Sequence, residues 1–172
     1  MPKSVLGFLL FCACACCSLQ GFADDSQSVG REYQLKTAYL FHFAELAEWP
    51  TASPVTICLQ GNSPIHTYLP ILDGQAIHNT EVQVKMGFPI VVAECRIIFM
   101  SDLHVLSPSL LEQAYKQHVL IVSDATGFAA KGGMIEFALR DNKLKLVVNL
   151  QSVKQAGLKL SSKLLRMAEI LE

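Results

Sequence analysis

The chain has 172 residues, of which 51% are hydrophobic and 17% charged, and its formal net charge is −1. It contains no basic block or stripe, so we expect no nucleic-acid partner. No long apolar run follows the N-terminal segment, so we expect no internal membrane span.

Residues 1–23 have the pattern of a secretory signal peptide. Lys3 gives a basic start, the uncharged apolar run 5–19 follows, and small residues occupy the −3 and −1 positions before a cut after Ala23. Cleavage there leaves residues 24–172, a single exported domain of 149 residues. An uncleaved anchor or a lipid-modified cysteine is the alternative, because this segment holds Cys12, Cys14, Cys16 and Cys17.

Two cysteines, Cys58 and Cys95, remain in the predicted mature chain. In an oxidising compartment such a pair most simply forms one disulfide. The two positions are 37 residues apart, and a loop of that length is worth about 3–4 kcal/mol in the chain-entropy model. Two buried free thiols are the alternative.

The N-terminal half is predicted to begin with a frayed segment at 24–30, followed by a helix over 31–49 that Pro50 ends. Apolar side chains recur in that helix at spacings of three and four: Leu35, Ala38, Tyr39, His42, Phe43, Leu46 and Trp49. Three further elements are predicted: a strand at 55–59, a helix at 64–72 and a strand at 81–85.

The C-terminal half opens with two predicted buried strands, at 95–100 and 119–122, whose apolar residues are continuous. Between them a helix is expected to start at Ser107-Pro108, with the serine as N-cap, and to run to Gln117.

The end of the chain is predicted to hold a β-hairpin and two helices. The hairpin strands are 134–140 and 143–149, with Asp141-Asn142 at the turn. A short helix at 149–156 and an amphipathic helix at 161–171 follow. Together the elements predict an α/β fold: a mostly parallel sheet flanked by helices on both faces, with an antiparallel C-terminal hairpin.

Four stretches of the chain resemble the YfiR family. They are EYQLKTAYLFHFAELAEWP at 32–50, VTICLQGNSP at 55–64, CRIIFMS at 95–101, and the long segment 119–168. Together they span nearly the whole predicted mature chain, and their combination in this order is more specific than any one of them.

The resemblance implies a periplasmic α/β domain that represses an inner-membrane diguanylate cyclase by binding the cyclase's periplasmic segment. It further implies an outer-membrane lipoprotein that sequesters the repressor, a homodimer, and control of cyclic di-GMP and biofilm formation. Some family members carry a second cysteine pair near the Gly-Gly-Met segment. Ala129 and Glu136 stand at those positions here, so that second disulfide is absent.

No motif in the chain predicts catalysis, a metal site or a cofactor. The histidines lack the spacing to cysteines that metal ligands show, and no serine lies in a nucleophile elbow. His42 lies in the apolar stripe of the first helix, where a core or interface role is expected. The glycine-rich segment 127–133 lacks the Gly-Lys-Ser/Thr ending of a phosphate loop. We therefore expect a binding protein and not an enzyme.

Two hypotheses about binding residues follow. Ile135, Val147 and Val153 are predicted to border a shallow apolar patch for a partner or small ligand, unless all three complete the core. Trp49 is a candidate interface residue, unless it packs on the sheet at the end of its helix. The leading function is a protein-binding regulator, and the alternative is a small-molecule sensor that feeds a membrane kinase or cyclase.

Overall fold

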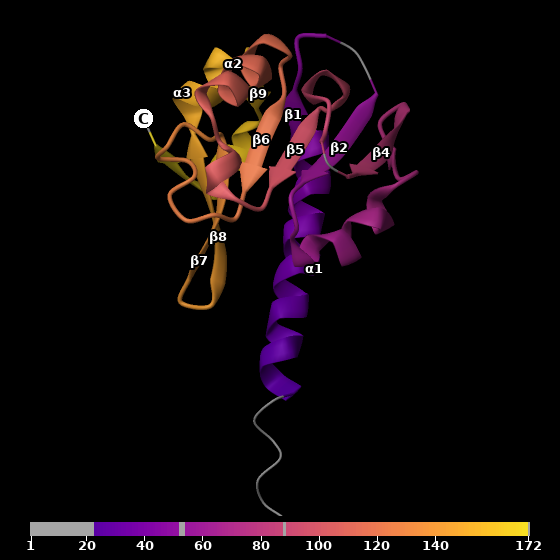
Figure 1. The fold of residues 1–172 in the computed structure, drawn as a ribbon, viewed down its shortest axis with the longest axis vertical. Coiled ribbons are helices and arrows are strands. Elements are labelled where there is room, and N and C mark those ends of the chain that lie inside the picture. The colour runs from indigo at the N-terminus through magenta and orange to yellow at the C-terminus, as the bar shows by residue number, and fades with distance from the viewer. Residues whose placement is uncertain (1–22, 52–53, 88, 172) are drawn as a thin grey trace, which may run out of the picture.

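The computed structural model of the protein describes residues 23–51, 54–87 and 89–171 (Figure 1). The predicted signal peptide lies outside the described residues, except for Ala23, at which the first helix begins.

An eight-stranded sheet forms the centre of the fold, in the order β10-β8-β7-β6-β5-β2-β4-β3. Five of its seven strand pairs are parallel, and the pairs β3–β4 and β7–β8 are antiparallel. The predicted fold class is therefore confirmed. The strands are β2 (Val55–Gln60), β3 (Ala76–Ile77), β4 (Thr80–Met86), β5 (Ile97–Met100), β6 (Leu120–Ser123), β7 (Ile135–Arg140), β8 (Lys143–Asn149) and β10 (Ala168–Leu171).

A separate two-stranded pair joins β1 (Ala47–Glu48) to β9 (Lys159–Leu160). The helices among the described residues are α1 (Ala23–Leu46), α2 (Pro108–Lys116), α3 (Leu150–Gln155) and α4 (Ser162–Leu165). Short 3₁₀ turns connect the strands: η1 (Pro64–Thr67), η2 (Leu69–Leu72), η3 (Val92–Glu94) and η4 (Leu103–Val105).

Aromatic contacts show which face of the sheet α1 covers. The ring of Phe43 in α1 lies 5.8 Å from that of Phe137 in β7, which in turn lies 6.3 Å from Phe99 in β5. The N-terminal half of α1 continues beyond the sheet (Figure 1). Side chains alternate along a strand, so Glu136 points to the opposite face.

The opposite face is covered by the loop that follows β6 and by α2. Glu136 accepts hydrogen bonds from the backbone of that loop. The loop in turn packs under α2, since a Cβ added at Gly132 would lie 3.3 Å from the Leu111 side chain. The helices therefore flank both faces, as the alternation of strands and helices predicts.

The local signals of the C-terminal half are confirmed. The Ser107 side chain accepts a hydrogen bond from the Leu110 N–H and caps α2. Asp141 and Asn142 have φ values of 51° and 57°, the left-handed conformation that a two-residue hairpin turn requires. Asn149 caps α3 through the Ser152 N–H.

The predicted boundaries of the first helix are wrong at both ends. Segment 24–30, predicted as frayed, belongs to α1, and the helix ends at Leu46 instead of Trp49. Ala47 and Glu48 pair with Leu160 and Lys159 instead of continuing the helix. This pairing joins segments more than 100 residues apart, so the local apolar spacing carries no sign of it.

Two other predicted helices are also wrong. Segment 64–72 forms the consecutive turns η1 and η2, since Pro70 has no N–H to continue an α-helical ladder. Segment 161–171 has one helical turn, α4, and then becomes β10, which pairs in parallel with β8. The edge of β8 offers unpaired backbone groups, and satisfying them outweighs the helical spacing of the leucines.

Candidate functional site

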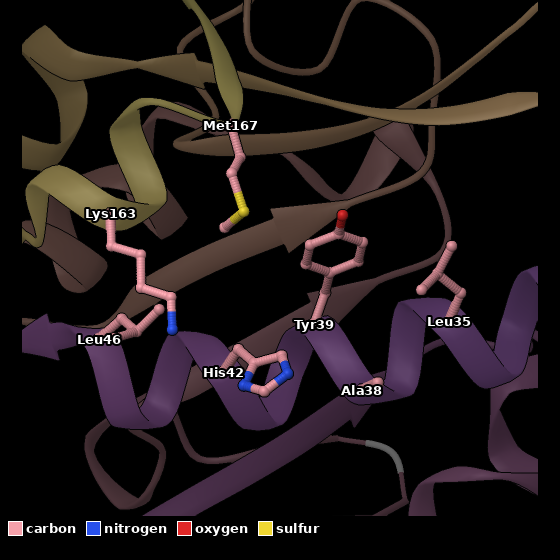
Figure 2. A pocket seen from close by; sticks show the side chains of 7 residues that line it. All are labelled: Leu35, Ala38, Tyr39, His42, Leu46, Lys163 and Met167. Carbon is pink, nitrogen blue, oxygen red and sulfur yellow. The ribbon is translucent and has the colours of Figure 1, made fainter.

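A groove of about 250 Å³ lies between α1 and the segment that contains α4 (Figure 2). Two of its lining side chains are large, apolar and half-exposed: Leu35 is 46% exposed and Met167 is 49% exposed. The full lining is Leu35, Ala38, Tyr39, His42, Leu46, Lys163 and Met167. A mainly apolar hollow with exposed apolar side chains is typical of a site that another molecule covers.

The groove lies along α1 because five of its residues recur at helical spacing, from Leu35 to Leu46. The core contacts of α1 come from a neighbouring stripe, in which Leu40 and Phe43 are fully buried and Ala44 nearly so. The helix is therefore apolar on two adjacent faces. Most of the stripe that the sequence analysis identified in 31–49 lines the groove.

The groove carries polar groups as well as apolar ones. Lys163 lies opposite His42 and Leu46 in Figure 2. His42 Nδ1 lies 2.9 Å from a carboxylate oxygen of Glu45. An apolar side chain of an occupant would match the apolar residues of this lining, and an acidic group would match Lys163.

A buried lysine fixes α1 on the sheet. Lys36 is 2% exposed, and its Nζ lies 2.6 Å from Asp124 Oδ2 and 2.5 Å from Glu32 Oε1. Asp124 directly follows β6, so the ion pair joins the helix to the carboxyl end of a central strand. The Lys36 ammonium also lies 4.2 Å from the centre of the Tyr33 ring.

The pKa values of Lys36 and Tyr33 are both raised by their surroundings. Burial lowers the pKa of Lys36, but hydrogen bonds to Asp124 and Glu32 outweigh it, so the net pKa is raised. Burial and the Asp124 charge raise the pKa of Tyr33. Lys36 and Tyr33 therefore both stay protonated throughout the neutral pH range.

The predicted apolar patch is not on the surface. Ile135 and Val153 are fully buried and Val147 is 4% exposed, so all three complete the core in this structure. Val147 stands in a row with Lys143 and Lys145, which suggested exposure. Val147 is nevertheless covered, because it pairs with Glu136 and so lies on the face of the sheet that the loop after β6 covers.

Trp49 has a different environment from the one expected for a helix-end residue. It follows β1 and is half-buried, and its ring centre lies 5.8 Å from the Arg96 guanidinium. Its indole Nε1 is buried and has no hydrogen-bond acceptor in the structure. The Trp49 side chain thus packs against the core and beside a cation, and it does not line the α1–α4 groove.

The predicted disulfide is present. Cys58 in β2 is bonded to Cys95, which directly follows η3 and lies two residues before β5, with the two Cα atoms 5.9 Å apart. Both cysteines are buried. The bond closes a 37-residue separation that contains the turns η1, η2 and η3 and the edge strands β3 and β4.

Ala129 and Glu136, the positions expected for a second cysteine pair in some relatives, are in direct contact. One carboxylate oxygen of Glu136 accepts from the Gly127 N–H at 3.1 Å, and the other accepts from the Ala129 N–H at 3.0 Å. Glu136 is 7% exposed. A charge-assisted pair of hydrogen bonds thus joins the loop to β7 where a covalent link is absent. The sequence feature from which this contact could have been predicted is the glutamate that follows the Gly-Gly-Met segment by two residues.

We predict that Glu136→Gln lowers the free energy of unfolding by about 1.5–3 kcal/mol, the contribution typical of hydrogen bonds to a charged group. The amide keeps one acceptor but turns the other into a donor that faces a backbone N–H. Urea denaturation would measure the loss. Glu169→Gln is the matched control, since the exposed Arg140–Glu169 ion pair is worth under about 1 kcal/mol. Equal midpoints for the two variants would contradict the prediction.

Neither a metal site nor a membrane helix emerges from the part of the chain that the structure describes. No group of three His, Cys, Asp or Glu side chains there is placed to hold a metal ion. Its helices are all too short or too polar to cross a bilayer.

Solved structures with a similar fold are distant in sequence. An ABC domain from Streptococcus pneumonia, in complex with L-Trp, is 11% identical, with a TM-score of 0.53 over 81% of this chain and 60% of that one. A conserved domain protein from Vibrio cholerae is 8% identical, with a TM-score of 0.53 over 79% of this chain and 60% of that one. This chain spans less than two thirds of either structure, and the likeness shows the fold alone.

The search of curated proteins gives no match. A family model described as YfiR/HmsC-like matches residues 33–169. The matched range includes the α1–α4 groove, both disulfide cysteines and the Glu136 contact. The chain therefore belongs to the YfiR/HmsC-like family.

Proposed function

We propose that this protein is a periplasmic regulator that holds an inner-membrane diguanylate cyclase inactive by binding the cyclase's periplasmic segment. Membership of the YfiR/HmsC-like family supports a regulatory role in the periplasm. Export with cleavage after Ala23 is part of the proposal. Repression lowers cyclic di-GMP and so disfavours biofilm formation.

The observation that carries the binding role is the α1–α4 groove. Leu35 and Met167 both lie half-exposed in its lining, and exposed apolar side chains grouped in one hollow are typical of an interaction site. We assign the groove to an apolar segment of the cyclase that carries an acidic group for Lys163. A partner that covers the groove would remove both side chains from water. This burial would favour binding by about 25 cal/mol for each Å² of apolar surface.

The test is the cyclic di-GMP level in cells that lack the gene, complemented by different copies. Deletion should raise cyclic di-GMP and the wild-type copy should restore it. Leu35→Glu combined with Met167→Glu should fail to restore it, since losing interface anchors typically costs 1–2 kcal/mol or more each, or roughly tenfold or more in affinity. Glutamate is a good helix former, so α1 is retained.

Ile71→Glu is the matched control, because Ile71 is a 70% exposed apolar residue outside the groove. This variant should restore repression fully, and all the variants should melt at the wild-type temperature. Unchanged cyclic di-GMP on deletion, in cells shown to express the protein, would refute the repressor function. Full repression by the double variant would refute the groove as the docking site.

The same variants separate other occupants of the groove. Sedimentation would show a dimer that becomes a monomer if a second copy fills it. Loss of binding to an outer-membrane lipoprotein, with repression kept, would assign the groove to that sequestering partner instead of the cyclase.

A further inference from the structure

A second pocket, of about 230 Å³, lies at the amino ends of the parallel strands β2 and β5. It shares no lining residue with the α1–α4 groove. Polar side chains and the disulfide contribute to its walls, including Thr56, Gln83, Cys95, Arg96 and Gln117. Its volume is below the roughly 300–1,000 Å³ typical of drug-sized ligand sites, so a small ligand fits it best.

Arg96 is a buried cation with no carboxylate partner among the described residues. It is 6% exposed, and its Nη2 donates to the Thr51 carbonyl at 2.6 Å and approaches the Thr51 hydroxyl at 3.3 Å. The nearby Glu94, also in the pocket lining, is paired with Lys85 at 2.6 Å. Burial lowers the pKa of Arg96, which marks the cost of keeping this charge away from water.

Trp49 lies next to Arg96, outside the residues that line the pocket. Its ring centre lies 5.8 Å from the Arg96 guanidinium, and its buried Nε1–H has no acceptor in the structure. A buried donor without an acceptor costs roughly 1–3 kcal/mol. Of these two residues, Arg96 lines the pocket and Trp49 does not, but the Trp49 ring lies close enough to Arg96 to report on binding there.

We infer that the pocket binds a small oxyanion, which the Arg96 guanidinium holds. A guanidinium presents five donors in a plane and binds oxyanions through two parallel hydrogen bonds. The Thr56 hydroxyl and the Gln83 and Gln117 amides supply further neutral donors around the ligand. The inference is independent of the regulatory proposal, because it concerns a different pocket and a different class of ligand.

Trp49 makes the test direct, because it is the only tryptophan in the chain. The purified protein is titrated with inorganic phosphate at constant ionic strength, and the tryptophan fluorescence is recorded. We expect a saturable change, accompanied by a rise in melting temperature with phosphate concentration. Sodium chloride at the same ionic strength should give neither effect. A flat or linear phosphate titration would overturn the inference.

Gln83→Glu tests the pocket without removing a buried group. The side chain is exposed and lines the pocket, so the change adds one negative charge of equal size there. A unit charge a few ångströms away contributes a few kcal/mol near a protein surface, so phosphate affinity should fall at least tenfold. Gln34→Glu makes the same change on an exposed part of α1 and should leave the affinity unchanged.

Arg96→Lys completes the series. It keeps the charge but loses the planar pair of donors, so it should fold and bind phosphate more weakly than the wild type. Wild-type phosphate affinity in both Gln83→Glu and Arg96→Lys would show that the fluorescence change reports another site, and would overturn the assignment to this pocket.

Discussion

Reduction of the Cys58–Cys95 disulfide should lower the free energy of unfolding by about 2–5 kcal/mol, the range typical of native disulfides in small secreted domains. The bond closes a 37-residue separation, which in the chain-entropy model is worth about 3–4 kcal/mol. Because domains of this kind are stable by only about 5–15 kcal/mol, the effect would be a large part of the total.

The loss should be concentrated at one edge of the sheet. The enclosed segment holds β3 and β4, which form the edge next to β2, and most side chains of β4 are exposed or half-buried. With little apolar burial of its own, this edge depends on its link to Cys95. Hydrogen exchange should therefore accelerate in β3 and β4 before it does in β5 and β6.

Urea denaturation with and without reductant measures the effect. A Cys58→Ala, Cys95→Ala variant serves as the control, since its midpoint should be low and insensitive to reductant. Unchanged midpoints for the wild type after verified loss of the bond would contradict the prediction.

Lys36→Met should lower the free energy of unfolding by about 3–5 kcal/mol, the cost typical of removing one partner of a buried ion pair. The variant leaves Asp124, whose side chain is 15% exposed, without its cation. It also removes the contact that joins α1 to the end of β6. Lys154→Met, at an exposed position of α3, should change stability by less than about 0.5 kcal/mol.

The pH dependence gives this prediction a distinct signature. The pKa of Lys36 is raised by folding, so its contribution to stability is fully present below the unfolded-state pKa of 10.5 and is lost as pH rises through the folded-state pKa. The difference between the wild type and Lys36→Met should therefore be constant at neutral pH and shrink in strong alkali. A difference that instead shrinks on acidification to pH 6 would contradict the assignment to Lys36.

Local features were predictable where the interacting groups are close in the chain or where the residue type restricts the backbone. Ser107 and Asn149 cap the helices that follow them, and Asp141-Asn142 adopts the left-handed turn. The buried strands also follow from their continuous apolar residues. The disulfide was predicted from a count, because only two cysteines lie outside the predicted signal peptide.

The candidate sites were predicted less well, because a side chain's exposure depends on segments far away in the sequence. The patch of Ile135, Val147 and Val153 is buried, and β10, which pairs with β8 beside Val147, was predicted to be a helix. The apolar stripe of α1 was recognised, but the spacing alone does not say that Leu35 is exposed and Leu40 buried.

The sequence by itself determined the α/β class, the cysteine pair, the hairpin and the family, because each depends on local patterning, a count, or a run of residues in order. The tertiary structure alone decided the groove between α1 and α4, the Lys36–Asp124 ion pair across 88 residues, and the pocket that Arg96 lines. None of these three features could be predicted from the sequence, for the same physical reason. Burial and the pairing of charges depend on which surfaces meet, and this is decided only when the whole sheet has assembled.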